Sequence, residues 1–133
     1  MKARGVMTQK TINSAAAPHP LGGYAQAIEV SSTTRRLYIS GQIPVTPEGS
    51  VPSSFQDQAK LVWANIEAQL CEVNMGMQNL AKVTIFLSDR KYGLENRQIR
   101  KDVLCGHAIA STVIIAGIFD DDWLLEIEAI AEA

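Results

Sequence analysis

Short runs of apolar residues, several of them alternating with polar ones, are spread along the whole chain and are typical of β-strands. They predict strands at residues 24–31, 37–45, 80–89, 111–118 and 123–133. The turn-forming stretch SSTTRR links the first two segments, so we expect these two strands to form an antiparallel hairpin. The segment STVIIAGI, residues 111–118, is almost wholly apolar and is expected to form a buried strand.

Two further segments have the apolar spacing of amphipathic helices. Residues 54–76 predict the first helix, and Ser54 followed by Asp57 favours its start at that point. Its apolar positions form a single stripe: Phe55, Ala59, Val62, Ile66, Leu70 and Val73. Residues 92–106 predict a second, more polar helix that ends at Gly106. The element order β-β-α-β-α-β-β therefore indicates an α+β fold, with one sheet and two helices packed on one face.

Length and composition restrict the class of protein. A chain of 133 residues is expected to form a single domain, residues 1–133. Its charged fraction is only 20%, so part of its apolar surface is expected to be buried against other subunits. The net charge of -2 argues against nucleic-acid or anionic-membrane binding. No secretory signal or membrane-spanning run is visible, so we expect a cytoplasmic protein with no membrane partner.

Several kinds of chemistry have little support in the sequence. His19 and His107 share no ligand spacing with each other or with a cysteine, so no metal site is expected. Cys71 and Cys105 are expected to be packed free thiols rather than nucleophiles. No phosphate-binding glycine motif is present. A basic group is interleaved with acidic residues, which favours a solvated helix face: Arg90, Lys91, Arg97, Arg100 and Lys101.

Small polar residues near glycines remain as candidates for binding a polar ligand, together with two glutamates in the segment EIEAIA. Side chains alternate between the two faces of a strand, so Glu126 and Glu128 share one face and Leu125, Ile127, Ala129 and Ala131 share the other. The glutamate face either meets water or contributes one carboxylate to a site. The alternation alone leaves both interpretations open.

The segments LGGYAQAI, YISGQIPVTPEGSVP and EIEAIA resemble the Rid family of reactive-intermediate deaminases, also called the YjgF/UK114 family. The resemblance begins at about Asn13, and residues 1–12 are expected to form a flexible N-terminal segment. It implies a chorismate-mutase-like fold and a homotrimer with a small-molecule ligand in each cleft between subunits. It also implies hydrolysis of enamines and imines to a carbonyl compound and ammonia, without metal or cofactor.

The resemblance also suggests roles for individual residues. Tyr24 matches the family's cleft tyrosine, Ser40 and Gly41 match a ligand-facing pair, and Asn96 matches an asparagine on the second helix. Glu126 matches the residue that positions the hydrolytic water, which leaves Glu128 a structural role. Backbone N–H groups of the segment Ser111, Thr112 and Val113 are expected to support the ligand from the other side.

The sequence departs from the family at one position. Ser111 stands where the deaminases carry an arginine that binds the substrate carboxylate, and a hydroxyl cannot form a bidentate ion pair. Arg97 or Arg100, on the same predicted helix as Asn96, would be able to supply the missing charge. We therefore expect an imine or enamine hydrolase whose substrate is not a standard 2-imino acid. The alternatives are a non-catalytic trimer that binds a metabolite and, with less support, a ribonuclease or translation inhibitor.

Overall fold

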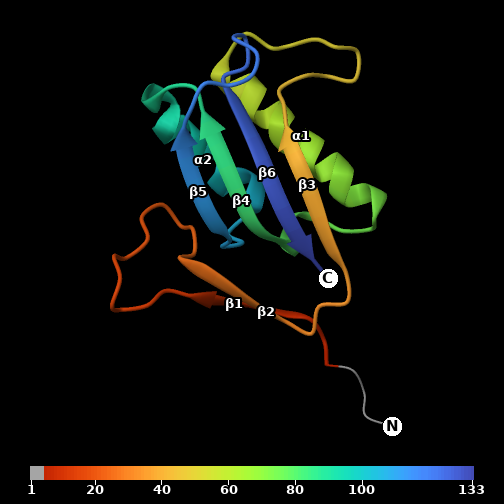
Figure 1. The fold of residues 1–133 in the computed structure, drawn as a ribbon, viewed down its shortest axis with the longest axis vertical. Coiled ribbons are helices and arrows are strands. Elements are labelled where there is room, and N and C mark those ends of the chain that lie inside the picture. Colours follow the sequence, from red (N-terminus) through yellow and green to blue (C-terminus); the bar gives the residue numbers. More distant parts are fainter. Residues whose placement is uncertain (1–4) are drawn as a thin grey trace.

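Four strands form the main sheet, in the spatial order β3-β6-β4-β5 (Figure 1). These strands are β3 (Arg36–Gln42), β4 (Leu80–Leu87), β5 (Ala110–Ile115) and β6 (Leu125–Glu132). Strand β6 runs antiparallel to both β3 and β4, whereas β4 and β5 are parallel. The structure is a computed structural model, and it describes residues 5–133.

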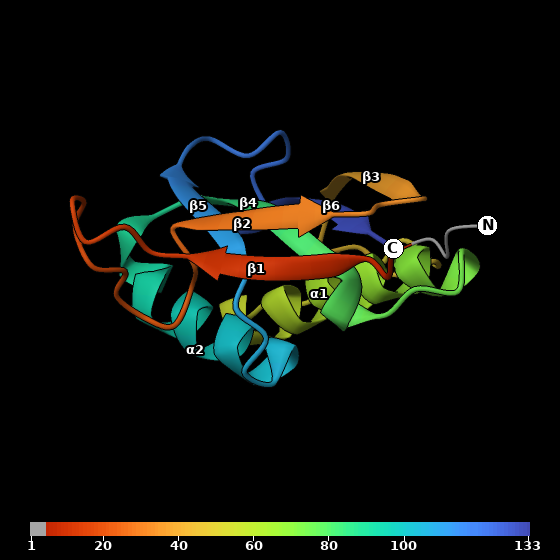
Figure 2. The same ribbon diagram turned by 90° about the horizontal axis from the view of Figure 1, so that it is seen from below.

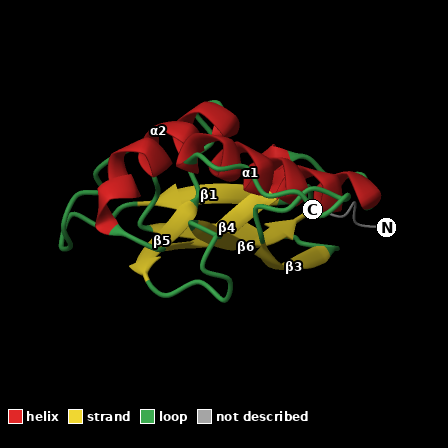
Figure 3. Cartoon of the chain, turned by 90° about the horizontal axis from the view of Figure 1, so that it is seen from above, coloured by secondary structure: helices red, strands yellow, loops and turns green. Residues whose placement is uncertain are grey.

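Both long helices cover the same face of this sheet (Figure 3). Helix α1 is Phe55–Glu72 and helix α2 is Gly93–Leu104, and short 3₁₀ turns precede β4 and α2 at Met77–Asn79 and Arg90–Tyr92. Helix α1 begins as predicted, because Ser54 Oγ accepts a hydrogen bond of 3.1 Å from the backbone N–H of Asp57. The α+β class with two helices on one face is therefore confirmed.

The core lies between α1, α2 and the main sheet. The predicted stripe of α1 is buried from Phe55 to Leu70, and Val73 is partly buried. The alternation in β6 is also confirmed, since Leu125, Ile127, Ala129 and Ala131 are all buried. Helix α2 ends where predicted, because Cys105 and Gly106 both adopt the left-handed backbone conformation that stops a helix, with φ of 48° and 83°.

A second, two-stranded sheet crosses the lower ends of the four strands (Figures 1 and 2). It pairs β1 (Thr8–Ile12) with β2 (Ala27–Ser31) in antiparallel register. The sequence predicts a single sheet and a flexible segment over residues 1–12, but Thr8–Ile12 form a strand instead. The part of that expectation that concerns residues 1–4 lies outside the described residues.

The hairpin predicted between residues 24–31 and 37–45, which contain β2 and β3, is wrong. Strand β2 pairs with β1, and β3 pairs with β6. The link between them explains the change of partner, since Ser32 has a φ of 59° and the N–H groups of Thr34 and Arg35 both bond to the carbonyl of Ala133. The chain is thereby attached to the end of β6 before β3 begins, and β3 continues along β6.

Strand β5 differs from its prediction as a buried strand. It is the edge strand of the main sheet, and Val113, Ile114 and Ile115 are 44%, 43% and 40% exposed. The apolar sequence of this strand therefore does not contribute to the core of this chain, and it leaves an apolar edge on the surface. In the part of the chain that the structure describes, neither helix has the length and hydrophobicity needed to cross a membrane.

Candidate functional site

The candidate residues divide between the two faces of the main sheet. Residues that are directly paired on neighbouring strands point to the same face. Ser111 pairs with the buried Val83, so Ser111 points to the face that carries the helices. Glu126 pairs with Phe86, one residue before the buried Leu87, so Glu126 points to the opposite, open face.

A polar cavity of ≈ 400 Å³ lies on the helix side, at the edge of the sheet. Four of the predicted site residues line it: Tyr24, Asn96, Ser111 and Val113. Arg90, Arg97 and Arg100 also line it, from α2 and the turn before it. Ser111, which stands where the deaminases carry an arginine, thus lies at the same cavity as Arg97 and Arg100. These are the two arginines that were considered as a replacement for the missing charge.

Arg100 is the most buried of these cations, with 5% of its surface exposed. It donates a hydrogen bond to the carbonyl of Gly22, and its guanidinium carbon lies 5.8 Å from the centre of the Tyr24 ring. Burial lowers the pKa of Arg100, the neighbouring Arg97 lowers it further, and Tyr24 raises it. The expectation of a solvated helix face is therefore wrong at Arg100.

The loop before Tyr24 fits closely against α2. Gly22 has a φ of 88°, in the left-handed region that favours glycine, and a side chain there would approach Cδ and Nε of Arg97 to 2.7 Å. Glycine suits residue 22 because of this backbone conformation, and the loop passes close to the side chain of Arg97. This approach places the Gly22 carbonyl against Arg100 and the Tyr24 ring over its guanidinium.

On the open face, Glu126 lies directly against the backbone of Gly41. A Cβ added at residue 41 would overlap Oε2 of Glu126 and lie 2.7 Å from its Cδ. Glu126 also lines a cavity of ≈ 240 Å³ with Phe86 and the loop from Ala116 to Phe119. A half-buried carboxylate at the wall of a cavity can orient a water molecule and accept its proton.

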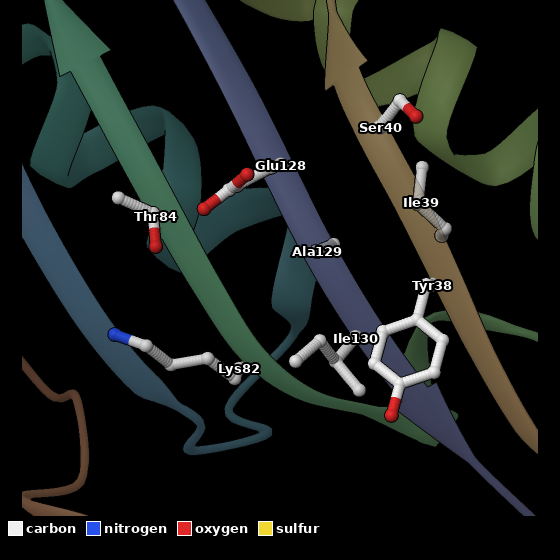
Figure 4. A pocket seen from close by; sticks show the side chains of 8 residues that line it. All are labelled: Tyr38, Ile39, Ser40, Lys82, Thr84, Glu128, Ala129 and Ile130. Atoms are coloured by element: carbon white, nitrogen blue, oxygen red, sulfur yellow. The ribbon is translucent and has the colours of Figure 1, made fainter.

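The centre of the open face carries a separate polar group (Figure 4). Ser40, Lys82, Thr84 and Glu128 line a cavity of ≈ 380 Å³ there. Lys82 donates a 2.6 Å hydrogen bond to Oγ1 of Thr112, burial lowers its pKa, and Glu128 raises it. Glu128, which was assigned a structural role, is exposed at this cavity.

Sequence reasoning overlooked Lys82 as a candidate, although a signal was present. It is the one charged residue in the segment LAKVTIFL, and strand alternation places it on the face opposite Val83. Thr112 also points to the open face, because it pairs with Thr84. The side chain of Thr112 therefore points away from those of Ser111 and Val113, which line the helix-side cavity.

The histidines and cysteines lie outside these cavities. Within residues 5–133 no three His, Cys, Asp or Glu side chains are grouped so as to hold a metal ion. His107 lies 2.8 Å from the carbonyl of Leu80 through Nε2. Cys71 and Cys105 are free, and both are exposed rather than packed as expected.

Comparison with solved structures places the fold among the Rid proteins. A Rid-family protein of unknown function, YyfB from Yersinia pestis, superposes with a TM-score of 0.84 at 18% identity, covering 94% of this chain and 98% of that one. A crystal structure of E. coli TdcF with bound serine gives a TM-score of 0.70 at 30% identity, with coverages of 93% and 98%.

The sequence comparisons define the family. The family model described as "Endoribonuclease L-PSP" matches residues 14–133. The protein named "Putative reactive intermediate deaminase TdcF" from Escherichia coli (strain K12) is 32% identical over 128 residues, covering 92% of this chain and 96% of TdcF. A "RutC family protein" from Aquifex aeolicus is 33% identical over 110 residues, with coverages of 82% and 86%. The chain belongs to the endoribonuclease L-PSP family, which is the Rid family that its sequence resembles.

Proposed function

We propose that this protein hydrolyses an imine or enamine to a carbonyl compound and ammonia, and that it does so as a homotrimer with each site shared between subunits. The observation that carries the proposal is the position of Glu126. Its side chain packs against Gly41, and its carboxylate lies at the wall of a cavity. The similarity to TdcF, whose name describes a reactive intermediate deaminase, supports the reaction class. The TdcF structure with bound serine supports a small amino-acid-like ligand.

Hydrolysis of a protonated imine requires little from the protein beyond positioning the substrate and a water molecule. The carbon of a protonated imine is already electrophilic, so the protein needs to hold the substrate and direct a water molecule at that carbon. In the proposed mechanism Glu126 orients the water and accepts its proton as the C–O bond forms. Glu126 then gives that proton to the nitrogen of the carbinolamine, and the C–N bond breaks to release ammonia while the hydroxyl loses its proton to water and becomes the carbonyl group. This sequence of steps uses no metal or cofactor.

The division between faces supports a site that is shared between subunits. Glu126 points to the open face and Ser111 to the helix face, so one chain cannot direct both at one substrate. A neighbouring subunit that presents its open face to the helix-side cavity would bring the two groups together. The exposed apolar edge of β5 supports such an assembly, since a single chain leaves it uncovered.

Two variants of β6 test the role of Glu126. Glu126→Gln keeps the volume of the side chain but removes the proton acceptor, so we expect a loss of kcat of about a hundredfold or more. Glu128→Gln is the matched control on the same face and should retain most of the activity. Turnover is measured on a panel of imines generated in solution, with the melting temperature of each variant as a check on folding. Equal losses in the two variants would contradict the assignment of Glu126.

The replacement of the family's arginine by Ser111 favours a second candidate, a trimer that binds a metabolite without converting it. Saturable binding of 2-oxo acids, with no turnover of any imine in the panel, would support this candidate. The description of the family model, Endoribonuclease L-PSP, names a third candidate, ribonuclease activity. RNA cleavage that survives Glu126→Gln and Ser40→Ala would support that role instead.

A further inference from the structure

Arg100 is a buried cation for which the described chain offers no anionic partner. Among residues 5–133 the one ion pair is Arg36 with Glu132, which joins β3 to the end of β6. The hydrogen-bond partner of Arg100 is a neutral carbonyl, that of Gly22. A guanidinium stays protonated at all physiological pH values, so burial without an anion carries a large desolvation cost.

A second cation in the same cavity makes this cost larger. Arg97 is close enough to lower the pKa of Arg100 by repulsion, and it follows Asn96 on the helix. Arg90 lines the same cavity from the turn before α2. Like charges that converge on one space are destabilising unless an anion lies between them. Arg90 and Arg97 are themselves exposed and reach the cavity from its solvent side, whereas Arg100 is buried.

Two uncharged polar groups at this cavity also lack partners. Ser111 Oγ and Asn96 Oδ1 are buried and form no hydrogen bond with any of residues 5–133. Both residues line the cavity beside the arginines. Buried polar atoms are nearly always paired in folded proteins, and two unpaired ones at a single cavity call for a bound ion, water or catalytic role. The serine hydroxyl can donate one hydrogen bond, and the asparagine amide can both donate and accept.

We propose that this cavity binds a group carrying two negative charges, either a phosphate or a pair of neighbouring carboxylates. Arginine is suited to both groups, because its guanidinium can donate two parallel hydrogen bonds to two oxygens of a carboxylate or a phosphate. If the protein is the proposed hydrolase, its substrate is then an imine or enamine that carries such a dianionic group, and this part rests on the proposed function. The binding of a dianion in the cavity does not depend on whether the protein is an enzyme.

Calorimetric titration of the full-length protein tests the proposal with three probes: pyruvate, 2-oxoglutarate and inorganic phosphate. We expect one of the two dianions to bind at least about tenfold more tightly than pyruvate, since each added charge-assisted bond contributes about a factor of ten. Tighter binding of 2-oxoglutarate assigns a dicarboxylate ligand, and tighter binding of phosphate assigns a phosphorylated one. Equal affinities for all three probes would overturn the proposal.

Arg97→Gln should weaken dianion binding about ten- to hundredfold and should affect pyruvate less. Arg97 is exposed, so this variant is expected to fold even if Arg100→Gln does not. Lys60→Gln is the matched control, because it removes one positive charge from an exposed position on α1. Undiminished dianion binding by Arg97→Gln, or equal weakening by Lys60→Gln, would show that the arginine cavity is not the binding site.

Binding and turnover separate this inference from the proposed function. Tight dianion binding that depends on Arg97, with no hydrolysis of any imine, would support the anion site and contradict the enzyme. Hydrolysis of imines that depends on Glu126, with dianion binding that is the same in wild type and Arg97→Gln, would support the enzyme and overturn the anion site.

Discussion

The contact between Gly41 and Glu126 joins two of the candidate site residues, one from β3 and one from β6. The carboxylate of Glu126 occupies the space where a Cβ of residue 41 would lie, so any side chain at residue 41 would displace it. Glycine at this position therefore leaves Glu126 free to lie where it does and is not needed for an unusual φ, because Gly41 is not among the residues with positive φ. The geometry of Glu126 depends on the absence of a methyl group on the neighbouring strand.

Gly41→Ala should reduce turnover of imine substrates about as much as Glu126→Gln, because the new Cβ would push the carboxylate out of position. Displacements of about 1 Å at a reacting group are expected to cost about a hundredfold in rate. The assay is the imine panel, with circular dichroism to show that the fold is retained.

Gly117→Ala is the matched control for Gly41→Ala. Gly117 lines the same cavity as Glu126, but a Cβ added there would meet no atom within 4 Å. This variant should keep nearly full activity. If both alanine variants lose activity to the same extent, the loss reflects the shape of the cavity and not the position of the carboxylate.

Sequence patterns could place some of these side chains but not others. The alternation in β6 correctly separates Glu126 from its buried neighbours, since strand geometry has a fixed period of two. Helical spacing shows that Arg97 and Arg100 lie close on α2, yet it cannot show that Arg100 is buried. That burial comes from the loop around Gly22, which is distant in sequence and is held by its own backbone conformation.

Among the secondary-structure elements, α1 is the one whose start and buried face are most clearly encoded. Ser54 is extended, with φ of -89° and ψ of 149°, and its hydroxyl accepts the N–H of Asp57. This hydrogen bond satisfies one of the N–H groups that the first turn of a helix leaves free. The buried face of α1 packs on the main sheet, so fraying of this end would expose Phe55 and Ala59.

Ser54→Ala should lower the free energy of unfolding by about 1 kcal/mol, because the N–H of Asp57 loses its acceptor. Urea denaturation followed by circular dichroism measures the change. Ser53→Ala, at the exposed preceding residue, should change the stability by less than about 0.5 kcal/mol. A larger effect at Ser53 than at Ser54 would show that the helix begins differently in solution.

Strand partners were much harder to predict than strand positions. Alternation specifies which side chains point inward, but it does not specify which strand lies alongside. Strand β2 was located correctly in sequence and given the wrong partner, because the bonds from Thr34 and Arg35 to Ala133 span the length of the chain. Strand β1 was overlooked because its segment, TQKTI, contains few apolar residues.

For the whole molecule, the uncovered apolar edge is the main structural reason to expect assembly. Val113, Ile114 and Ile115 lie together on the edge strand, and Tyr38 on the opposite edge strand is 70% exposed. An edge strand with apolar side chains and unpaired backbone groups tends to associate. Burial of this edge against other copies of the chain would both cover it and complete the proposed site.

We expect size-exclusion chromatography with light scattering to give the mass of a trimer at micromolar concentration. Ile114→Asp, which places a charge at the centre of the exposed edge, should shift the protein towards monomers and reduce imine turnover in parallel. Val51→Asp makes the same change at a partly exposed loop position and should leave the trimer intact. A wild-type monomer at this concentration would contradict both the trimer and the shared site.

The packing of Gly41 against Glu126 also has an evolutionary consequence. While residue 126 remains a glutamate, any mutation at residue 41 moves the carboxylate, so the two positions are not free to change independently. A lineage that replaces the glutamate with a shorter residue relaxes the restriction on its partner, and other amino acids can then accumulate there. Relatives that keep both residues should be those still selected for hydrolysis. Relatives that have lost both should have retained the scaffold for another purpose.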